Sequence, residues 1–390
     1  MRIGEGEVAA EERCLSNGRS GEWRVASGES SDSWRNSRLW AKATIALIAM
    51  AVLLSAAIGC KSQADGSGAA AKSSAAEQSV SAPNAILSPA EALKAAQALG
   101  GPQPDDNAPA AAQTGGFDGH RALELTAKQL AYGPRPSGSA ALQQLQVFLK
   151  TELATYGCTV DVDAFQVDTP VGHRKMENIL VKIPGEKPGI ILLGTHYDTA
   201  TLPDFVGAFD SASSTAIMLE IARNLCGHPA GRYGVWIAFL DGEEAQNHGV
   251  WTNEDSVYGS REMSARLSNS GDLAKVKAFL LADLVGGKTA HYKRDTASTQ
   301  WLVDLVWEVA KRLGYADVFV DGTSTMGGDD DFPFLNRKVP AVDVFDFDIG
   351  NDVPYWHNQN GTDTLDKISA RNLAITGHVF LESVKELQGK

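Results

Sequence analysis

The chain has 390 residues, a formal net charge of −13 at pH 7 and 43% hydrophobic residues. Nucleic-acid partners require clustered lysine and arginine to contact phosphates, so this acidic balance excludes them from the functions we expect. The hydrophobic content suffices for a buried core, and residues 119–390 are numerous enough for one large α/β domain.

Composition divides the chain into four segments. They are an N-terminal extension of uncertain role at residues 1–34, a signal segment at 35–60, a tether at 61–118 and a globular domain at 119–390. The tether consists mainly of Ala, Ser, Gly, Gln and Pro and has scarcely any aromatic residue. Such a segment buries too little apolar surface to offset the entropy lost on ordering, so we expect it to be disordered.

The signal segment has a basic flank followed by an apolar run at residues 43–58 and then Cys60. The run is shorter than the roughly 20 residues of a membrane-spanning helix, and small residues precede the cysteine, as is typical of a signal peptide. The ending Ala57-Ile58-Gly59-Cys60 resembles a bacterial lipobox. That resemblance implies an exported lipoprotein of the periplasm or cell envelope, anchored to the membrane by a lipid on Cys60. A plain membrane anchor remains the alternative.

Helices and strands alternate along the globular domain. Apolar residues recur at helical spacing in residues 120–132, 140–156, 211–225, 299–313 and 370–387. Apolar runs typical of strands cover residues 178–183, 189–195, 234–240, 276–284 and 339–344. This alternation predicts an α/β fold with a mostly parallel sheet that is covered on both faces.

Polar and acidic residues follow these predicted strands at the points where the strands end. They are His196-Tyr197-Asp198, Asp241-Gly242-Glu243-Glu244, Asp283, and Tyr355-Trp356-His357 after the last strand and its loop. Two further acidic positions lie in loops: Asp210 before a helix, and Asp329-Asp330-Asp331 before Phe332-Pro333-Phe334. In parallel sheets the carboxyl ends of strands tend to form the site, so we expect these groups to converge.

One subset of these residues has the chemistry of a zinc site with an open position. Such a site takes about three nitrogen and oxygen ligands from the protein, and Asp210, Glu244 and His357 would supply them. Glu243 would lie beside the metal without binding it, where a carboxyl group with a raised pKa can carry protons. We expect one zinc ion.

The same residues resemble a known superfamily. The succession His-Tyr-Asp, Asp-Ser, Asp-Gly-Glu-Glu, Asp-Leu-Val-Gly and Trp-His is similar to that of the zinc-dependent exopeptidases, which include aminopeptidases and animal-type glutaminyl cyclases. Trp251, the stretch Asp-Ser-Val-Tyr-Gly-Ser-Arg at 255–261 and Trp356 before His357 are similar to the cyclases in particular. The resemblance covers residues 120–390 and implies an α/β/α sandwich around a twisted, mixed sheet.

The resemblance also implies an activity and individual roles. The activity is the conversion of an N-terminal glutamine of peptides or proteins into pyroglutamate, with release of ammonia, by a monomeric enzyme. Glu243 matches the acid–base residue, Asp283 and Asp329 match two aspartates in a hydrogen-bond network with it, and Trp251 and Trp356 match residues that line the substrate pocket. Asp330 is the alternative to Asp329, because the family often has Asp-Asp-His where this chain has three aspartates.

Three alternatives remain open from the sequence. In a di-zinc aminopeptidase, His196 and Asp283 would be additional ligands, Asp210 would bridge the ions and Glu243 would activate water. A second alternative is a binding protein without catalysis on the same scaffold. Finally, Cys158 and Cys226 could form a disulfide or remain two buried thiols.

Overall fold

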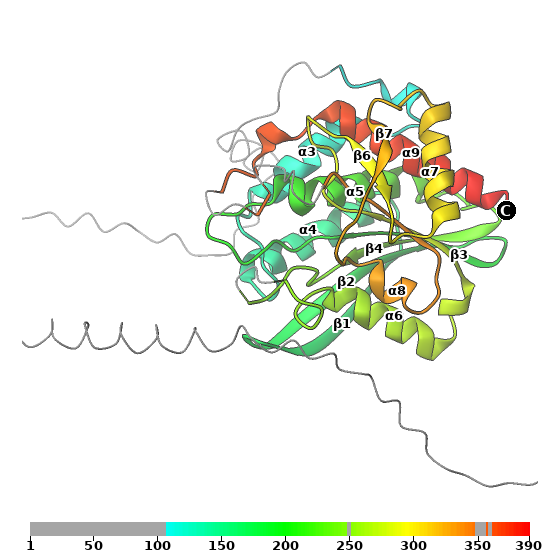
Figure 1. Cartoon of the computed structure of the whole chain (residues 1–390). Coiled ribbons are helices and arrows are strands. Elements are labelled where there is room, and N and C mark those ends of the chain that lie inside the picture. The colour runs from blue at the N-terminus through cyan, green and yellow to red at the C-terminus, as the bar shows by residue number, and fades with distance from the viewer. Residues whose placement is uncertain (1–106, 248–250, 348–355, 358–360) are drawn as a thin grey trace, which may run out of the picture. The chain divides into compact units, whose positions relative to one another are not determined.

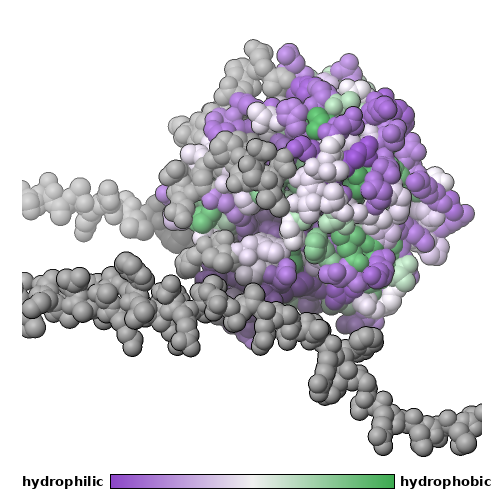
Figure 2. Space-filling view, in the orientation of Figure 1, coloured by the Kyte–Doolittle hydropathy of each residue, from purple (hydrophilic) through white to green (hydrophobic). Residues whose placement is uncertain are grey.

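A computed structural model describes residues 107–247, 251–347, 356–357 and 361–390. The predicted extension, the signal segment, Cys60 and residues 61–106 of the predicted tether lie outside these ranges. Within them no helix is both long enough and apolar enough to cross a membrane. The face shown in Figure 2 is mostly hydrophilic, with a small apolar area among polar residues.

The predicted α/β fold is confirmed. A six-stranded sheet has the order β1-β2-β4-β3-β5-β8 (Figure 1). Its strands are β1 (Val160–Thr169), β2 (Gly172–Ile183), β3 (Lys187–His196), β4 (Tyr233–Leu240), β5 (Val276–Ala282) and β8 (Ala341–Val344). The pairings of β3 with β4, β3 with β5 and β5 with β8 are parallel, whereas β2 is antiparallel to both β1 and β4. The sheet is therefore mixed and mostly parallel at its centre.

Helices cover both faces of this sheet. On one face the core includes side chains from α3 (Gly119–Leu130), α4 (Ala140–Thr155), α5 (Ser213–Leu225), α7 (Gln300–Arg312) and α9 (Ala370–Gln388). On the other face a smaller apolar cluster joins the sheet to α6 (Tyr258–Ser270) and α8 (Phe332–Leu335). Neighbouring strand residues alternate between the two clusters, since successive side chains of a strand point to opposite faces. The result is the expected α/β/α sandwich.

The five predicted helices and five predicted strands are all present, with shifted ends. The strand expected at 276–284 ends at Ala282, because Leu284 has a φ of 47°, which a strand cannot contain. Capping fixes the start of two helices: the Asp118 side chain accepts from the backbone of His120 and Arg121, and Ser139 accepts from Leu142.

Several elements were not predicted. β1 is an edge strand whose residues alternate between half-buried and exposed, and its Val162 is exposed, so it lacks the continuous apolar run of the central strands. β6 (Tyr292–Asp295) and β7 (Phe319–Ser324) form a separate two-stranded parallel sheet. α6 and α8 were missed as well: α6 has 13 residues but few apolar ones in helical spacing, and α8 has only four residues.

Cys158 and Cys226 form a disulfide, which decides a question that the sequence left open. Cys158 follows α4 and Cys226 follows α5, and their Cα atoms are 5.2 Å apart. The bond closes a segment that contains β1, β2, β3 and α5. It joins the residues between α4 and the β1–β2 hairpin to the end of α5. Disulfides persist in oxidising compartments such as the periplasm and the extracellular space.

Candidate active site

The carboxyl ends of the central strands bring the predicted site residues together. His196 ends β3, Asp283 follows β5, and Glu243 and Glu244 follow β4. Side chains at these ends and in the adjoining loops line one cavity of about 330 Å³. All eight residues that the sequence analysis singled out as catalytic, metal-binding or substrate-binding are in its wall: Asp210, Glu243, Glu244, Trp251, Asp283, Asp329, Trp356 and His357.

Three of these residues form a group that could hold a metal ion. The Nε2 atom of His357 lies 3.0 Å from Asp210 Oδ2 and 3.0 Å from Glu244 Oε1. Candidate ligand atoms of the three residues all lie within 4.8 Å of one another. Both carboxylates are buried, and two buried negative charges this close require a positive charge beside them. A nitrogen and oxygen donor set of three, open to a cavity, fits a zinc ion that keeps one position free for substrate.

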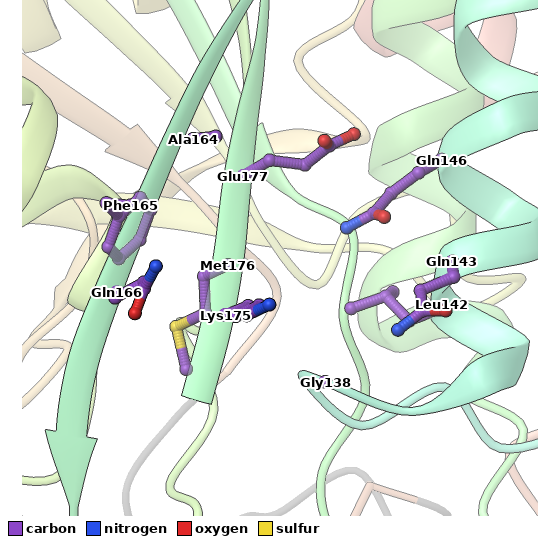
Figure 3. Close-up of a pocket in the computed structure, with 10 residues that line it drawn as sticks. All are labelled: Gly138, Leu142, Gln143, Gln146, Ala164, Phe165, Gln166, Lys175, Met176 and Glu177. Carbon is purple, nitrogen blue, oxygen red and sulfur yellow. The ribbon is translucent and has the colours of Figure 1, made fainter. Parts of the chain in front are cut away.

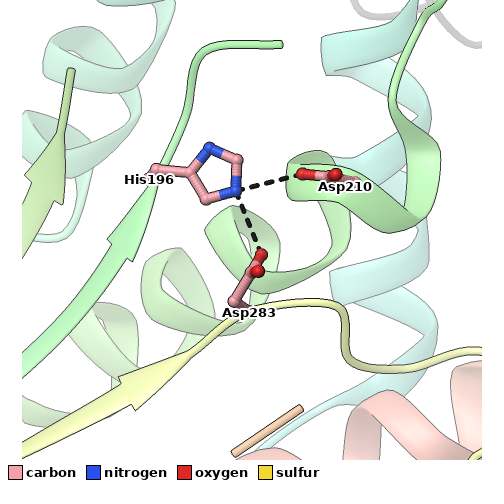
Figure 4. A group of neighbouring side chains, drawn as sticks. All are labelled: His196, Asp210 and Asp283. Carbon is pink, nitrogen blue, oxygen red and sulfur yellow. Dashed lines mark hydrogen bonds and ion pairs between the residues drawn. The ribbon is translucent and has the colours of Figure 1, made fainter. Parts of the chain in front are cut away.

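A second group shares one of these ligands. His196 Nε2 lies 3.0 Å from Asp283 Oδ1 and 3.1 Å from Asp210 Oδ1 (Figure 4). The carboxylate of Asp210 thus faces both groups with different oxygens, as the di-zinc alternative requires. His196 is 1% exposed, however, and it is not among the residues that line the cavity. Asp210 and Asp283, the other two members of this group, do line the cavity.

Glu243 is almost completely buried beside the first group. Burial raises the pKa of its carboxyl group well above the usual value, and the negative charges of Asp329 and Glu244 add to the rise, while His196 opposes it. The indole Nε1 of Trp251 donates a hydrogen bond to Glu243 Oε1 at 3.4 Å. A carboxyl group with a raised pKa in a sheltered cavity is suited to accept and return a proton near neutral pH.

The structure distinguishes between the two aspartates that the sequence offered as network partners. Asp329 lines the cavity, and burial raises the pKa of its carboxyl group, with the charge of Asp283 as the next cause. Asp330 is buried and is not among the residues that line the cavity. Asp283 accepts from the backbone of Leu284 at 2.8 Å and from His196. Asp329, and not Asp330, therefore shares the cavity wall with Glu243.

Trp356 contacts two of the three residues of the metal group. Trp356 stacks on the His357 ring with centroids 4.3 Å apart, and its Nε1 donates to Asp210 Oδ2 at 3.0 Å. Phe347 packs against the same indole at a centroid distance of 4.7 Å. Trp356 therefore both forms a wall of the cavity and holds a proposed ligand in place.

Asp198 positions the strand end that carries Glu243 and Glu244, a role that sequence analysis did not assign. Its two carboxylate oxygens accept from the backbone amides of Glu243 at 3.2 Å and Glu244 at 3.4 Å. Its Oδ1 also lies 3.4 Å from Nδ1 of His196. Ser137, from the loop between α3 and α4, donates to Asp198 at 3.1 Å. Contacts to backbone amides leave no pattern in the sequence, so only the presence of Asp198 in the His-Tyr-Asp motif could have pointed to it.

Asp363 does the same for the turn that carries Asp210, and it was also missed. Its oxygens accept from the backbone amides of Phe209 at 2.8 Å and Asp210 at 3.1 Å. The buried guanidinium of Arg135 supports the same turn by donating to the Val206 carbonyl at 2.9 Å. A ligand carboxylate held by partners of this kind loses little conformational freedom when it binds a metal.

A second hollow of about 320 Å³ lies between the β1–β2 hairpin and α4 (Figure 3). None of the predicted site residues lines it. Two of its polar side chains bond to neighbouring residues: Gln146 donates to the hydroxyl of Tyr197 at 2.9 Å, and Glu177 pairs with Lys150 at 2.6 Å. The chemistry that the sequence predicts is therefore concentrated in the other cavity.

Comparisons with known proteins agree with this geometry. Residues 178–384, more than half of the chain, match the model of Peptidase family M28. The chain belongs to peptidase family M28. Within the family, it is similar to the solved structure of an Acidobacteriales bacterium glutaminyl cyclase, with 37% identity, a TM-score of 0.66, and coverage of 74% of this chain and 99% of that chain.

Two further proteins are similar to this chain. A glutaminyl-peptide cyclotransferase-like protein of Bos taurus is 28% identical over 299 residues, which are 68% of this chain and 76% of that protein. The solved structure of a Zn-dependent exopeptidase from Parabacteroides distasonis is 25% identical, has a TM-score of 0.62, and covers 69% of this chain and 98% of its own. The resemblance inferred from the motifs is thereby confirmed.

We predict that Asp363→Asn weakens metal binding by about tenfold to a hundredfold, as removal of a group that holds a ligand in place commonly does. The amide replaces one of the two accepting oxygens with an NH₂ group, which would face a backbone N–H and cannot accept from it. Affinity would be measured by competition with a chelating dye. Asp366→Asn, which changes a partly exposed carboxylate three residues away, is the control. Equal affinities in the two variants would contradict the role of Asp363.

Proposed function

We propose that this member of family M28 is a zinc-dependent glutaminyl cyclase that converts the N-terminal glutamine of peptides or proteins into pyroglutamate and releases ammonia. The observation that carries the proposal is the sharing of one cavity by a three-residue metal group and the buried Glu243 carboxyl group. The names of the similar proteins and structures support it further.

The reaction requires the enzyme to position the substrate, to activate the γ-carbonyl group and to transfer protons. The α-amine of the substrate attacks its own γ-amide carbon, a C–N bond forms, and the C–N bond to the leaving ammonia breaks. Both reacting groups belong to one residue, so folding the side chain back removes most of the entropy cost of bringing them together. A zinc ion bound by Asp210, Glu244 and His357 would supply a Lewis acid for the γ-carbonyl oxygen.

Glu243 is the proposed proton carrier. Its carboxylate takes a proton from the attacking amine and returns it to the nitrogen that departs as ammonia, so no net proton is gained or lost. Asp283 and Asp329 lie in the same cavity wall and would orient the substrate nitrogens and the Glu243 carboxyl group. Trp251 and Trp356 would exclude water, which could otherwise hydrolyse the amide.

We further propose that the enzyme works with one zinc ion. Asp210, Glu244 and His357 all line the cavity, whereas in the group of His196, Asp210 and Asp283 only the two aspartates line it. In an aminopeptidase that uses two ions, both must reach the substrate or its attacking water. The similar proteins and structures that are named glutaminyl cyclases support the cyclase over the di-zinc aminopeptidase.

We predict that Glu243→Gln lowers kcat by at least about a hundredfold while zinc content stays equal to that of the unmodified protein, because an amide cannot carry the proton. Ammonia release from a Gln-initiated dipeptide and metal analysis of the purified protein measure the two quantities. Glu308→Gln, at an exposed position on α7, is the control. An active Glu243 variant would remove this residue from the role, and release of free glutamine from Gln-naphthylamide by the unmodified enzyme would favour a peptidase.

The enzyme is also proposed to be exported and held at the membrane by a lipid on Cys60. The basic flank, the short apolar run and the small residues before Cys60 support this proposal. The disulfide between Cys158 and Cys226 supports export independently, since such bonds are rare in the reducing cytosol.

Expression of the full chain in a Gram-negative host tests this proposal. The unmodified protein is expected in the membrane fraction with incorporated fatty acid, and Cys60→Ser should remain unlipidated. Cys14→Ser, which replaces the other cysteine outside the disulfide, is the matched control and should behave as the unmodified protein. Lipidation that persists in Cys60→Ser would overturn the assignment of the anchor.

A further inference from the structure

We infer that Gly328 is a positioning residue for the acid–base chemistry: its bare Cα seats the Trp251 indole so that the indole N–H reaches the Glu243 carboxylate. The inference rests on the proposed function, because it assigns to Gly328 a part in the work of Glu243. Gly328 lies outside the metal group and outside every motif from which the function was predicted.

The contact at Gly328 leaves no room for a side chain. A Cβ atom on Gly328 would lie 2.2 Å from Cη2, 2.9 Å from Cζ2 and 3.3 Å from Cζ3 of Trp251. These three atoms form the outer edge of the indole, so the ring lies directly against the glycine backbone. The ring is rigid and cannot bend away as the end of a flexible chain could. Any residue larger than glycine at position 328 must therefore displace the whole indole.

The other edge of the same ring touches Glu243. Nε1 of Trp251 donates to Glu243 Oε1 at 3.4 Å, and Glu243 is only 8% exposed. The hydrogen bond from the indole N–H fixes the direction of Oε1. Because one rigid ring makes both contacts, a displacement of the indole at Gly328 also moves its N–H relative to the Glu243 carboxylate. Misplacement of a catalytic group by about 1 Å can lower the rate a hundredfold.

The neighbouring glycine provides a natural contrast. A Cβ atom on Gly327 would meet no heavy atom within 4 Å. Neither glycine has a positive φ, so alanine strains the backbone at neither position. Gly327→Ala and Gly328→Ala thus make the same chemical change in the same loop, and they differ in whether the new methyl group meets Trp251.

A double-mutant cycle between positions 328 and 251 separates this role from a general effect on the loop. Gly328→Ala alone is expected to lower kcat by roughly ten- to a hundredfold, with unchanged zinc content. Trp251→Phe removes both the outer ring atoms and the N–H donor, so it should lower kcat as well. In the Trp251→Phe background, adding Gly328→Ala should cause little further loss, because the atoms that it would strike are gone.

The inference is overturned if the two losses multiply, or if Gly328→Ala keeps the kcat of the unmodified enzyme. Crystal structures of the two alanine variants give a readout that does not depend on activity: the indole should move away from Glu243 in Gly328→Ala and stay in place in Gly327→Ala. An indole that stays in place in Gly328→Ala contradicts the inference. Failure of the unmodified enzyme to release ammonia would instead contradict the proposed function, while the crystal structures would still decide the role of Gly328.

Discussion

The structure depends on the convergence of two buried carboxylates and one imidazole that come from three distant parts of the chain. Asp210 lies in the turn before α5, Glu244 follows β4, and His357 follows the last strand by more than ten residues. Burying two acids side by side is costly without a compensating cation, so the arrangement is favourable only as a metal site or with a charged histidine. The other residues of the cavity wall surround this group.

The fold meets the requirement through backbone contacts made by carboxylates that do not line the cavity. Asp198 holds the strand end of Glu243 and Glu244, and Asp363 holds the turn of Asp210. Parallel pairing of β3 with β4 and β5 places the three strand ends at one edge of the sheet. Asp210 and Glu244 are therefore held by a turn and a strand end before any metal binds, and the proton carrier Glu243 is placed beside them by the same means.

The parts of the fold that the sequence could predict are those with a physical signature in the order of residues. The central strands are continuous apolar runs because both of their faces are buried, and this is why their ends, and hence Glu243, Glu244 and Asp283, could be located. The edge strand β1 alternates polar and apolar residues around Asp161 and Asp163, one face is exposed, and it was missed.

The supporting contacts could not be predicted, for two different reasons. Asp198 and Asp363 act on backbone amides, and any residue offers such an amide, so no partner appears in the sequence. The packing of Trp251 on Gly328 joins residues from separate loops at a distance that only the folded chain sets. The choice between Asp329 and Asp330 also required the structure, because adjacent residues of identical chemistry differ only in direction.

Diffraction data collected on both sides of the zinc absorption edge, from crystals of the zinc-loaded protein, test the central claim most directly. We expect one strong anomalous peak at about 2.0–2.2 Å from ligand atoms of Asp210, Glu244 and His357. A peak away from these three side chains, or a second peak of equal strength between His196 and Asp283, would contradict the single-zinc site on which the proposed mechanism depends.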